Sequence, residues 1–478
     1  MATRIIGSST LPTTTDARTD EEILAELQTY RPVDPNSERN IWAFLTFGGP
    51  QWDKGLAAAK PWCQRNITSW VRRHAIRGTG WTVRVLDMVP GSANHFSRFV
   101  PEDTAEFFPQ AFRRYSHSDS DSDGVNAEKS GGKGLTGTHR APHAADLLRL
   151  PLLYLHGGVW LDVGFTLFRD LDDLCWDALA DPGSPLELAG FRMTISDEIA
   201  MFWNGFIAAR RGCVAVRHWH DLFLKLWEGG QGASEGGNGG GGNKGGGKGG
   251  RAATTTEGMA ADPLLRHLPR YEVPSSTGEP PAFAYADYVD YLIQMFCLER
   301  LRHTRDAALG WDGPAWFAQK VLLYECVTEV YWAQALTHWD GRKQFEMLSR
   351  KRREGEGEGE DGRVGEVEHP EDEDEGYREA RAFVDGILET SSTMKLSHGL
   401  VTEQREYLAR IWDQPDHADA DREPGTFAAY LRWASVHYQQ TRELKPLLLP
   451  VREDALLTGG LFDAVGTPHP HWGNEKAT

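Results

Sequence analysis

Three ionisable residues lie in an otherwise apolar stretch that runs from Pro142 to Leu171. Asp146 and Arg149 are three positions apart in a helical pattern, so both side chains project from one face of the helix. Asp162 closes a short apolar run that is typical of a buried strand. A buried charge is costly unless something compensates it. These residues therefore form either a structural ion pair or a site for a charged or polar ligand.

The apolar pattern predicts the elements that position them. Between residues 142 and 156 apolar side chains cover most of the helix surface, which is too much for a surface helix. Gly157 and Gly158 supply the helix stop. The apolar run at 159–163 then predicts a buried strand that carries Asp162 to its carboxyl end.

A second unit is predicted upstream of this helix. Strand 41–47, helix 62–76 and strand 81–86 are spaced as in a parallel βαβ unit. Ligands of open sheets collect at the carboxyl ends of the strands, where Asp87 and Asp162 are expected to lie. The spacing thus predicts an α/β fold that contains a parallel βαβ unit, with Asp87 and Asp162 at the carboxyl ends of strands.

The pattern A-x-D-L-L-R-x-x-L-L-Y-x-x-G-G-V-W-x-D at residues 144–162 resembles the core of glycosyltransferase family 32 and of the related capsular polysaccharide synthesis proteins, many of them fungal. The resemblance implies a GT-A-like nucleotide-binding sandwich with a mainly parallel sheet and an added C-terminal helical region. It also implies a retaining glycosyltransferase that moves a sugar from a UDP- or GDP-sugar donor to a glycan or small-molecule acceptor.

In that group the helix Asp and Arg contact the donor sugar, and an Asp-x-Asp motif at the strand end holds a metal ion on the diphosphate. By resemblance, Asp146 and Arg149 contact the sugar and Asp162 is the first Asp of the motif, so that all three are expected to be catalytic. The second Asp is replaced by Gly164. A hard cation on a diphosphate requires oxygen ligands, so the need for Mn²⁺ or Mg²⁺ stays open.

Further site residues are expected from the same resemblance. Asn204 would face the reaction centre, where a carboxamide can donate to and accept from sugar hydroxyls, although Asn is equally typical of a tight turn. Thr254–Met259 would offer backbone N–H groups to phosphate. His398 belongs to a late segment that family members bring back to the donor site, and it is a candidate metal ligand, with a structural role as the alternative. The donor-binding residues would also include Phe44, Leu45, Gly158 and Trp160.

Composition divides the chain into packed and unpacked parts. Residues 229–250 contain fourteen glycines in twenty-two positions and are too flexible to pack. Residues 316–339 are predicted to form one helix that covers the sheet. The predicted parts are a disordered N-terminal tail at 1–38 with a short helix at 21–27, a catalytic domain at 39–340 with flexible inserts at 116–137 and 229–250, a disordered acidic segment at 341–378, a C-terminal helical part at 379–445 that completes the site, and a tail at 446–478.

Charge and composition exclude several classes of protein. The net charge is −18, but residues 354–375 hold twelve acidic residues and one Arg and so contribute −11 of it. No basic patch for nucleic acid remains. The five cysteines lack CxxC spacing, which implies neither a disulfide framework nor a zinc site. No apolar run reaches the length of a transmembrane segment, so a cytoplasmic protein is expected, with a Golgi-associated one as the alternative.

Two other functions fit parts of the sequence. A catalytically degenerate member that binds nucleotide or glycan without transfer is favoured by Gly164, and by Leu45 or Thr46 at a first-strand position where relatives place a stacking aromatic. A glycoside hydrolase would use two carboxylates that flank a sugar, but the spacing of Asp146 and Asp162 does not require this. The donor sugar, its base and the acceptor stay open.

Overall fold

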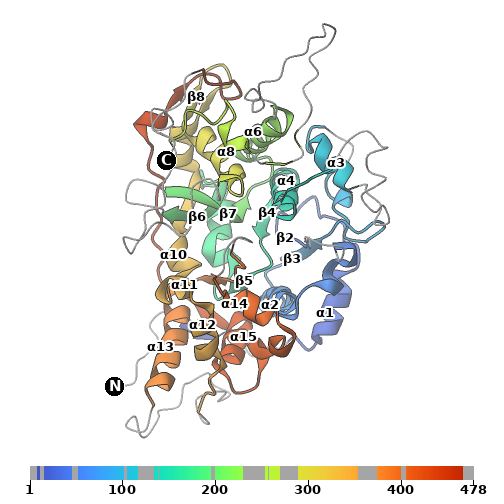
Figure 1. Ribbon diagram of the computed structural model, residues 1–478, viewed down its shortest axis with the longest axis vertical. Helices are drawn as coiled ribbons and strands as arrows, with labels where there is room; N and C mark the ends of the chain where they lie inside the picture. Colours follow the sequence, from blue (N-terminus) through green and yellow to red (C-terminus); the bar gives the residue numbers. More distant parts are fainter. Residues whose placement is uncertain are drawn as a thin grey trace, which may run out of the picture.

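The computed structural model describes residues 8–10, 16–45, 52–101, 105–116, 134–137, 139–194, 200–229, 253, 255–256, 258–269, 289–353, 374–399 and 405–466. A six-stranded sheet with the order β10-β6-β7-β4-β2-β3 forms its centre (Figure 1). The strands are β2 (Asn40–Phe44), β3 (Thr82–Leu86), β4 (Gly158–Leu161), β6 (Leu188–Thr194), β7 (Ala200–Ala209) and β10 (Val321–Glu325).

Five of these strands point in one direction. β7 runs antiparallel to its neighbours β4 and β6, and every other neighbouring pair in this sheet is parallel. The prediction of a mainly parallel sheet in an α/β protein is therefore confirmed. The carboxyl ends of β2, β4 and β6 share one edge, where open sheets bind their ligands.

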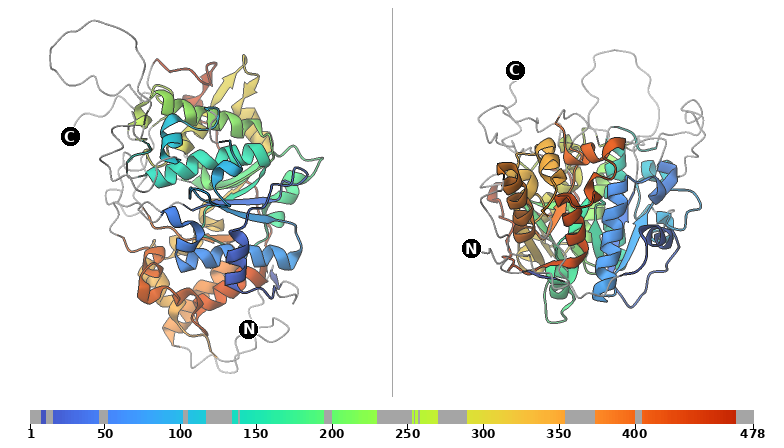
Figure 2. Two further views of the ribbon diagram at one scale, coloured as in Figure 1. Left: turned by 90° about the vertical axis from the view of Figure 1, so that its right-hand side faces the viewer. Right: turned by 90° about the horizontal axis from the view of Figure 1, so that it is seen from below.

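Helices cover both faces of the sheet, which explains why β2 and β4 are buried throughout. On one face α4 (Arg140–His156) packs on α6 (Val214–Gly229), which packs on α8 (Ile293–Arg302). On the other face α2 (Pro61–Arg77) packs on α15 (Phe427–His437). Figure 2 shows the three layers from the side.

A close backbone approach fixes the entry into β4. Gly158 has a φ angle of 107°, and a Cβ there would lie 2.2 Å from the backbone oxygen of Asn40 in β2. Only glycine tolerates both the conformation and the contact. The diglycine that ends α4 thereby also lets β4 lie beside β2 and sets the position of Asp162 beyond the far end of the strand.

The predicted secondary structure is wrong in one segment. Residues 316–339 do not form one helix: α9 (Gly313–Lys320) ends at β10, and α10 (Cys326–Glu329) and α11 (Trp332–Leu336) follow. A short apolar run such as Val321–Tyr324 fits a buried helix and a buried strand equally well by periodicity. Its pairing with β6 decides in favour of the strand.

The structure also differs from the predicted unpacked segments. In the N-terminal tail the short helix is present as α1 (Asp20–Leu27), which buries Ile23 completely and packs on α2. α12 (Gly341–Ser349) lies within the segment predicted to be acidic and disordered. In the C-terminal tail Leu461 is fully buried. The predicted inserts and the acidic stretch lie largely outside the described residues.

A second, two-stranded sheet joins the C-terminal part of the chain to the centre. β5 (Phe165–Leu167) follows β4 closely and pairs antiparallel with β11 (Thr393–Lys395), which lies just after α13 (Glu375–Thr390). Lys395 is opposite Phe165 in this ladder. The last residue of β11 is thereby brought to the carboxyl end of β4.

Candidate active site at the carboxyl end of β4

Asp162 follows the last residue of β4 and is held by charged partners. Its Oδ2 lies 2.6 Å from Nζ of Lys395, and its Oδ1 accepts the indole N–H of Trp160 at 3.0 Å. A guanidinium nitrogen of Arg149 lies 3.9 Å from Oδ1. Burial acts to raise the pKa of Asp162, but the charges of Lys395 and Arg149 outweigh it and lower this pKa below the ordinary carboxyl value. Asp162 is therefore ionised at neutral pH.

Asp146 and Arg149 form the predicted pair on α4, and both are almost fully buried. Arg149 Nη2 lies 3.0 Å from Asp146 Oδ1, and the guanidinium lies 5.1 Å from the ring centroid of Trp160. His143, one turn earlier, contacts Asp146 Oδ2 at 3.0 Å and Thr256 Oγ1 at 2.9 Å. The helix thus presents a fixed carboxylate and a fixed cation toward the end of β4.

Asn204 completes the cluster from a bulge in β7. The register between β6 and β7 shifts after Gly190, so residues 204–206 have no partner on β6. Bulges of this kind re-aim side chains and are frequent beside active sites. Asn204 Nδ2 donates to Gln294 Oε1 at 3.0 Å and lies 3.4 Å from Asp146 Oδ1, while its backbone oxygen accepts from Arg149 Nη1 at 2.8 Å.

Backbone atoms occupy the space that a second carboxylate at position 164 would need. A Cβ on Gly164 would lie 2.4 Å from the backbone oxygen of Leu396, directly after β11. The backbone N–H of Leu396 donates to the oxygen of Gly164 at 2.9 Å. An Asp at position 164 is therefore incompatible with β11 in this place.

The carboxylate oxygens of this cluster are poorly suited to bind a divalent cation. Such an ion needs several oxygen ligands and is repelled by cations that already lie beside them. The ammonium group of Lys395 and the guanidinium group of Arg149 already lie against the carboxylates of Asp162 and Asp146. Among the described residues, no cluster of three or more His, Cys, Asp or Glu side chains could hold a metal ion.

Several predicted site residues lie elsewhere. The side chain of His398 contacts Asp413 Oδ2 at 3.0 Å and lies against the ring of Trp62, so the structure does not bring it to Asp162. Gly158 begins β4 and Asp162 follows its last residue, so the two lie at opposite ends of the strand. The side chains of Phe44 and Leu45 are buried in the core, and Thr46 lies outside the described residues.

Asp87, at the end of β3, has a local role. Its carboxylate accepts the backbone N–H of Val89 at 3.0 Å and the hydroxyl of Ser92 at 2.8 Å. Burial raises the pKa of Asp87 above the ordinary carboxyl value. The residue therefore shapes the turn after β3 and makes no described contact with the cluster around Asp162.

Sequence reasoning missed four members of the cluster. His143 was within reach, because it stands three residues before Asp146 on the same helix. Lys395 lies in the late segment that was expected at the donor site, although His398 was chosen from it. Trp203, whose ring centroid lies 4.7 Å from Lys395 Nζ, and Gln294 on α8 gave no signal beyond an ordinary core pattern. Thr256 lies in the Thr/Gly segment that was expected near the site, whereas Thr254 is outside the described residues.

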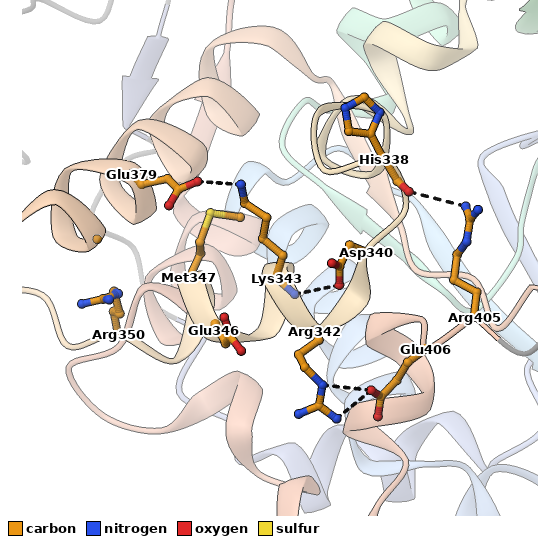
Figure 3. Close-up of a pocket in the computed structure, with 11 residues that line it drawn as sticks. His338, Asp340, Arg342, Lys343, Glu346, Met347, Arg350, Glu379, Arg405 and Glu406 are labelled. Atoms are coloured by element: carbon orange, nitrogen blue, oxygen red, sulfur yellow. Dashed lines mark hydrogen bonds and ion pairs between the residues drawn. The ribbon is translucent and has the colours of Figure 1, made fainter. Parts of the chain in front are cut away.

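A surface pocket of about 670 Å³ shares no lining residue with this cluster (Figure 3). It lies beside α12, and its walls carry both signs of charge. Arg342 pairs with Glu406 at 2.7 Å and Lys343 pairs with Glu379 at 2.7 Å. Because these charges compensate one another, the pocket shows no preference for a cationic or an anionic ligand.

Three fungal proteins resemble this chain over nearly their whole lengths. Glycosyltransferase afumC of Aspergillus fumigatus is 49% identical over 447 residues, which cover 94% of this chain and 97% of that protein. O-glycosyltransferase braB of Annulohypoxylon truncatum is 37% identical over 452 residues, with 94% and 91% covered. O-glycosyltransferase PaGT of Phomopsis amygdali is 34% identical over 458 residues, with 95% and 94% covered. No family model matches the chain.

These identities place the chain among the glycosyltransferases. It is accordingly an enzyme of the transferase class, which acts on a sugar donor and an acceptor, and a degenerate binding protein is not favoured. The relationship extends to fungal O-glycosyltransferases at 37% and 34% identity. In the described part of the chain, no helix combines the length and the apolar character needed to cross a bilayer.

Proposed function

We propose that the protein is a retaining O-glycosyltransferase of the family 32 type, which transfers a sugar from a nucleotide-diphosphate donor to a hydroxyl group of a small molecule or glycan. The observation that carries the proposal is the meeting of the buried Asp146–Arg149 pair with Asp162 at the carboxyl edge of a mainly parallel sheet. This is the place where a GT-A-like sandwich would bind its donor. The printed names of two relatives support transfer to oxygen.

The donor sugar would lie against α4 and the bulge of β7. Each carboxylate oxygen has two acceptor positions, so Asp146 can accept from a sugar hydroxyl while it keeps its contacts with Arg149 and His143. Asn204 supplies a carboxamide beside it. The surrounding contacts fix both side chains before the donor arrives, which is the condition for accurate positioning.

The main chemical demand is to stabilise the departing diphosphate. In the transfer step the bond between the anomeric carbon and the β-phosphate oxygen breaks, and its electron pair stays on that oxygen. The acceptor oxygen bonds to the anomeric carbon on the same face, and its proton passes to the departing phosphate oxygen. Arg149 provides a planar guanidinium near this negative charge. Because the leaving group accepts the proton, the step requires no separate base.

Substitution of Asp162 tests the proposal. We expect Asp162→Asn to lower transfer from UDP- or GDP-sugars by at least about 100-fold, as measured by mass spectrometry of the glycosylated acceptor and by release of nucleoside diphosphate. Glu325→Gln is the matched control. Glu325 ends β10 at the same edge, pairs with Arg192, and has a side chain that is 24% exposed against 27% for Asp162. Unchanged turnover in Asp162→Asn, or equal losses in the two variants, would refute the assignment.

A further inference from the structure

We propose that the ammonium group of Lys395 binds the donor diphosphate, in the place that a metal ion takes beside the first Asp of an Asp-x-Asp motif. This inference rests on the proposed function and deepens it, since it names the cation of the same site. It follows from the poor fit of the donor set to a divalent ion, and from the group that the structure puts there instead.

Lys395 has donors left for a ligand. Its Nζ lies 2.6 Å from Asp162 Oδ2 and 4.7 Å from the ring centroid of Trp203. An ammonium group carries three N–H donors, and within the described residues its one hydrogen bond goes to Asp162. The side chain is 14% exposed, so the group is largely desolvated while the side chain keeps some contact with solvent. A desolvated cation interacts strongly with an anion.

The backbone holds Lys395 in this position. Its N–H donates to the oxygen of Val330 at 3.2 Å, and its oxygen accepts from Gln334 Nε2 at 2.7 Å. The antiparallel pairing of β11 with β5 sets Lys395 opposite Phe165 and so fixes its position along the strand. A cation fixed before the substrate binds needs little reorganisation to stabilise a developing negative charge.

One structural feature accounts for both departures from the metal-binding motif. β11 pairs with β5, which follows β4 closely. Leu396, the residue after β11, therefore fills the space that a side chain at Gly164 would need. The same strand ends in Lys395 and delivers the ammonium group to Asp162. The loss of the second carboxylate and the gain of the cation are therefore physically coupled.

The exchange also conserves charge. Two carboxylates and a divalent ion sum to zero, as do one carboxylate and one ammonium group. The diphosphate would thus meet the same net charge beside Asp162 in both cases. Arg149, whose guanidinium lies 3.9 Å from Asp162, adds a second cation nearby.

Calorimetric titration of the full chain with UDP, GDP and the corresponding monophosphates tests the proposal, each with a chelator and with Mn²⁺. We expect the wild-type protein to bind a nucleoside diphosphate equally well in both conditions. Lys395→Met should weaken diphosphate binding by about tenfold or more, as for the loss of a charged hydrogen bond, and should weaken monophosphate binding much less. A purely structural lysine would not discriminate between the two ligands.

Two further variants make the test decisive. Lys395→Met removes the ammonium partner of Asp162, so the double variant Asp162→Asn/Lys395→Met provides a charge-balanced site with the same expected loss. Lys320→Met is the control. Lys320 pairs with Glu187 just before the amino end of β10, whereas Asp162 lies at the carboxyl end of β4. Wild-type binding that appears only with Mn²⁺ would overturn the role of Lys395 but leave the proposed function intact, as would full diphosphate binding by both variants. Absence of nucleotide binding in every condition would overturn both proposals.

Discussion

Asp162 and Lys395 are separated by 233 positions in the sequence, yet their charged groups lie 2.6 Å apart at the carboxyl end of β4. The contact joins the central sheet to the C-terminal part of the chain through the short β5–β11 ladder. The candidate active site is therefore assembled from both parts. Its electrostatics depend on the pairing of these two side chains rather than on Asp162 alone.

This pairing predicts that Asp162→Asn separates binding from transfer. Removal of the carboxylate frees the ammonium group of Lys395 from its ion pair and also from its fixed position. We therefore expect the affinity for a nucleoside diphosphate to stay the same or rise, while sugar transfer, which depends on a positioned cation, falls. Titration calorimetry and a product assay on the same preparation measure the two effects. If Asp162 instead held a metal ion on the diphosphate, nucleotide binding would be lost together with transfer.

Restoring the second carboxylate should fail. In Gly164→Asp the new Cβ would lie 2.4 Å from the backbone oxygen of Leu396, so β11 would have to move away from β5. We expect a loss of stability of about 1–3 kcal/mol, typical of overpacking, and no gain of binding with Mn²⁺. Gly466→Ala is the control, because no atom of the described residues lies within 4 Å of its added Cβ. A stable Gly164→Asp protein with Mn²⁺-dependent binding would contradict the packing argument.

We predict that the folded protein loses stability in acid, because His303 is buried in its neutral form. Its Nδ1 contacts the backbone oxygen of Glu299 at 2.8 Å and its Nε2 accepts the N–H of Arg452 at 3.1 Å, which fixes the neutral ring. Burial lowers the pKa of His303 to about 4, against about 6.5 for an unfolded His. The folded state therefore binds fewer protons, and stability is lost as the pH falls from about 6.5 toward 4.

The size of this effect can be measured by urea unfolding. Between pH 7 and pH 5 the wild-type protein should lose about 2 kcal/mol through His303. His303→Gln removes the titrating group, so the difference in free energy of unfolding between wild type and variant should shrink by that amount. A difference that does not change with pH would contradict the assigned neutral state.

The sequence could predict those parts of the site that are local in the chain. Asp146 and Arg149 share a helix face, and Asp162 stands at the end of an apolar strand, so spacing and hydropathy predict where all three lie. Their roles as site residues were expected from the resemblance to glycosyltransferase family 32. The strand and helix pattern predicts the parallel βαβ unit at residues 41–86, and the mainly parallel sheet was expected from the resemblance. The strand at Val321–Glu325 escaped prediction because its apolar run carries no period that separates strand from helix.

Lys395 could not be assigned because its role depends on a long-range ladder. Within the segment that begins at Lys395, His398 is the conventional metal ligand and was therefore chosen. Only the register of β11 on β5 shows that Lys395 reaches Asp162 while His398 reaches Asp413. Residue type pointed to His398, whereas the register of β11 on β5 brings Lys395 to Asp162.

The central claim is that the buried pair on α4 serves sugar transfer, and Arg149→Lys tests it most directly. Lysine keeps the charge but cannot contact Asp146, the oxygen of Asn204 and the face of Trp160 at once, as Arg149 does. Arg302→Lys is the matched control, since Arg302 forms the same kind of buried pair with Glu299 on α8.

The measurement is the release of nucleoside diphosphate from a panel of UDP- and GDP-sugars with a mixture of small hydroxyl acceptors. We predict release from at least one donor by the wild-type protein and by Arg302→Lys, and release slower by about 100-fold in Arg149→Lys. Release from no donor, or equal rates in Arg149→Lys and the wild-type protein, would contradict the central claim.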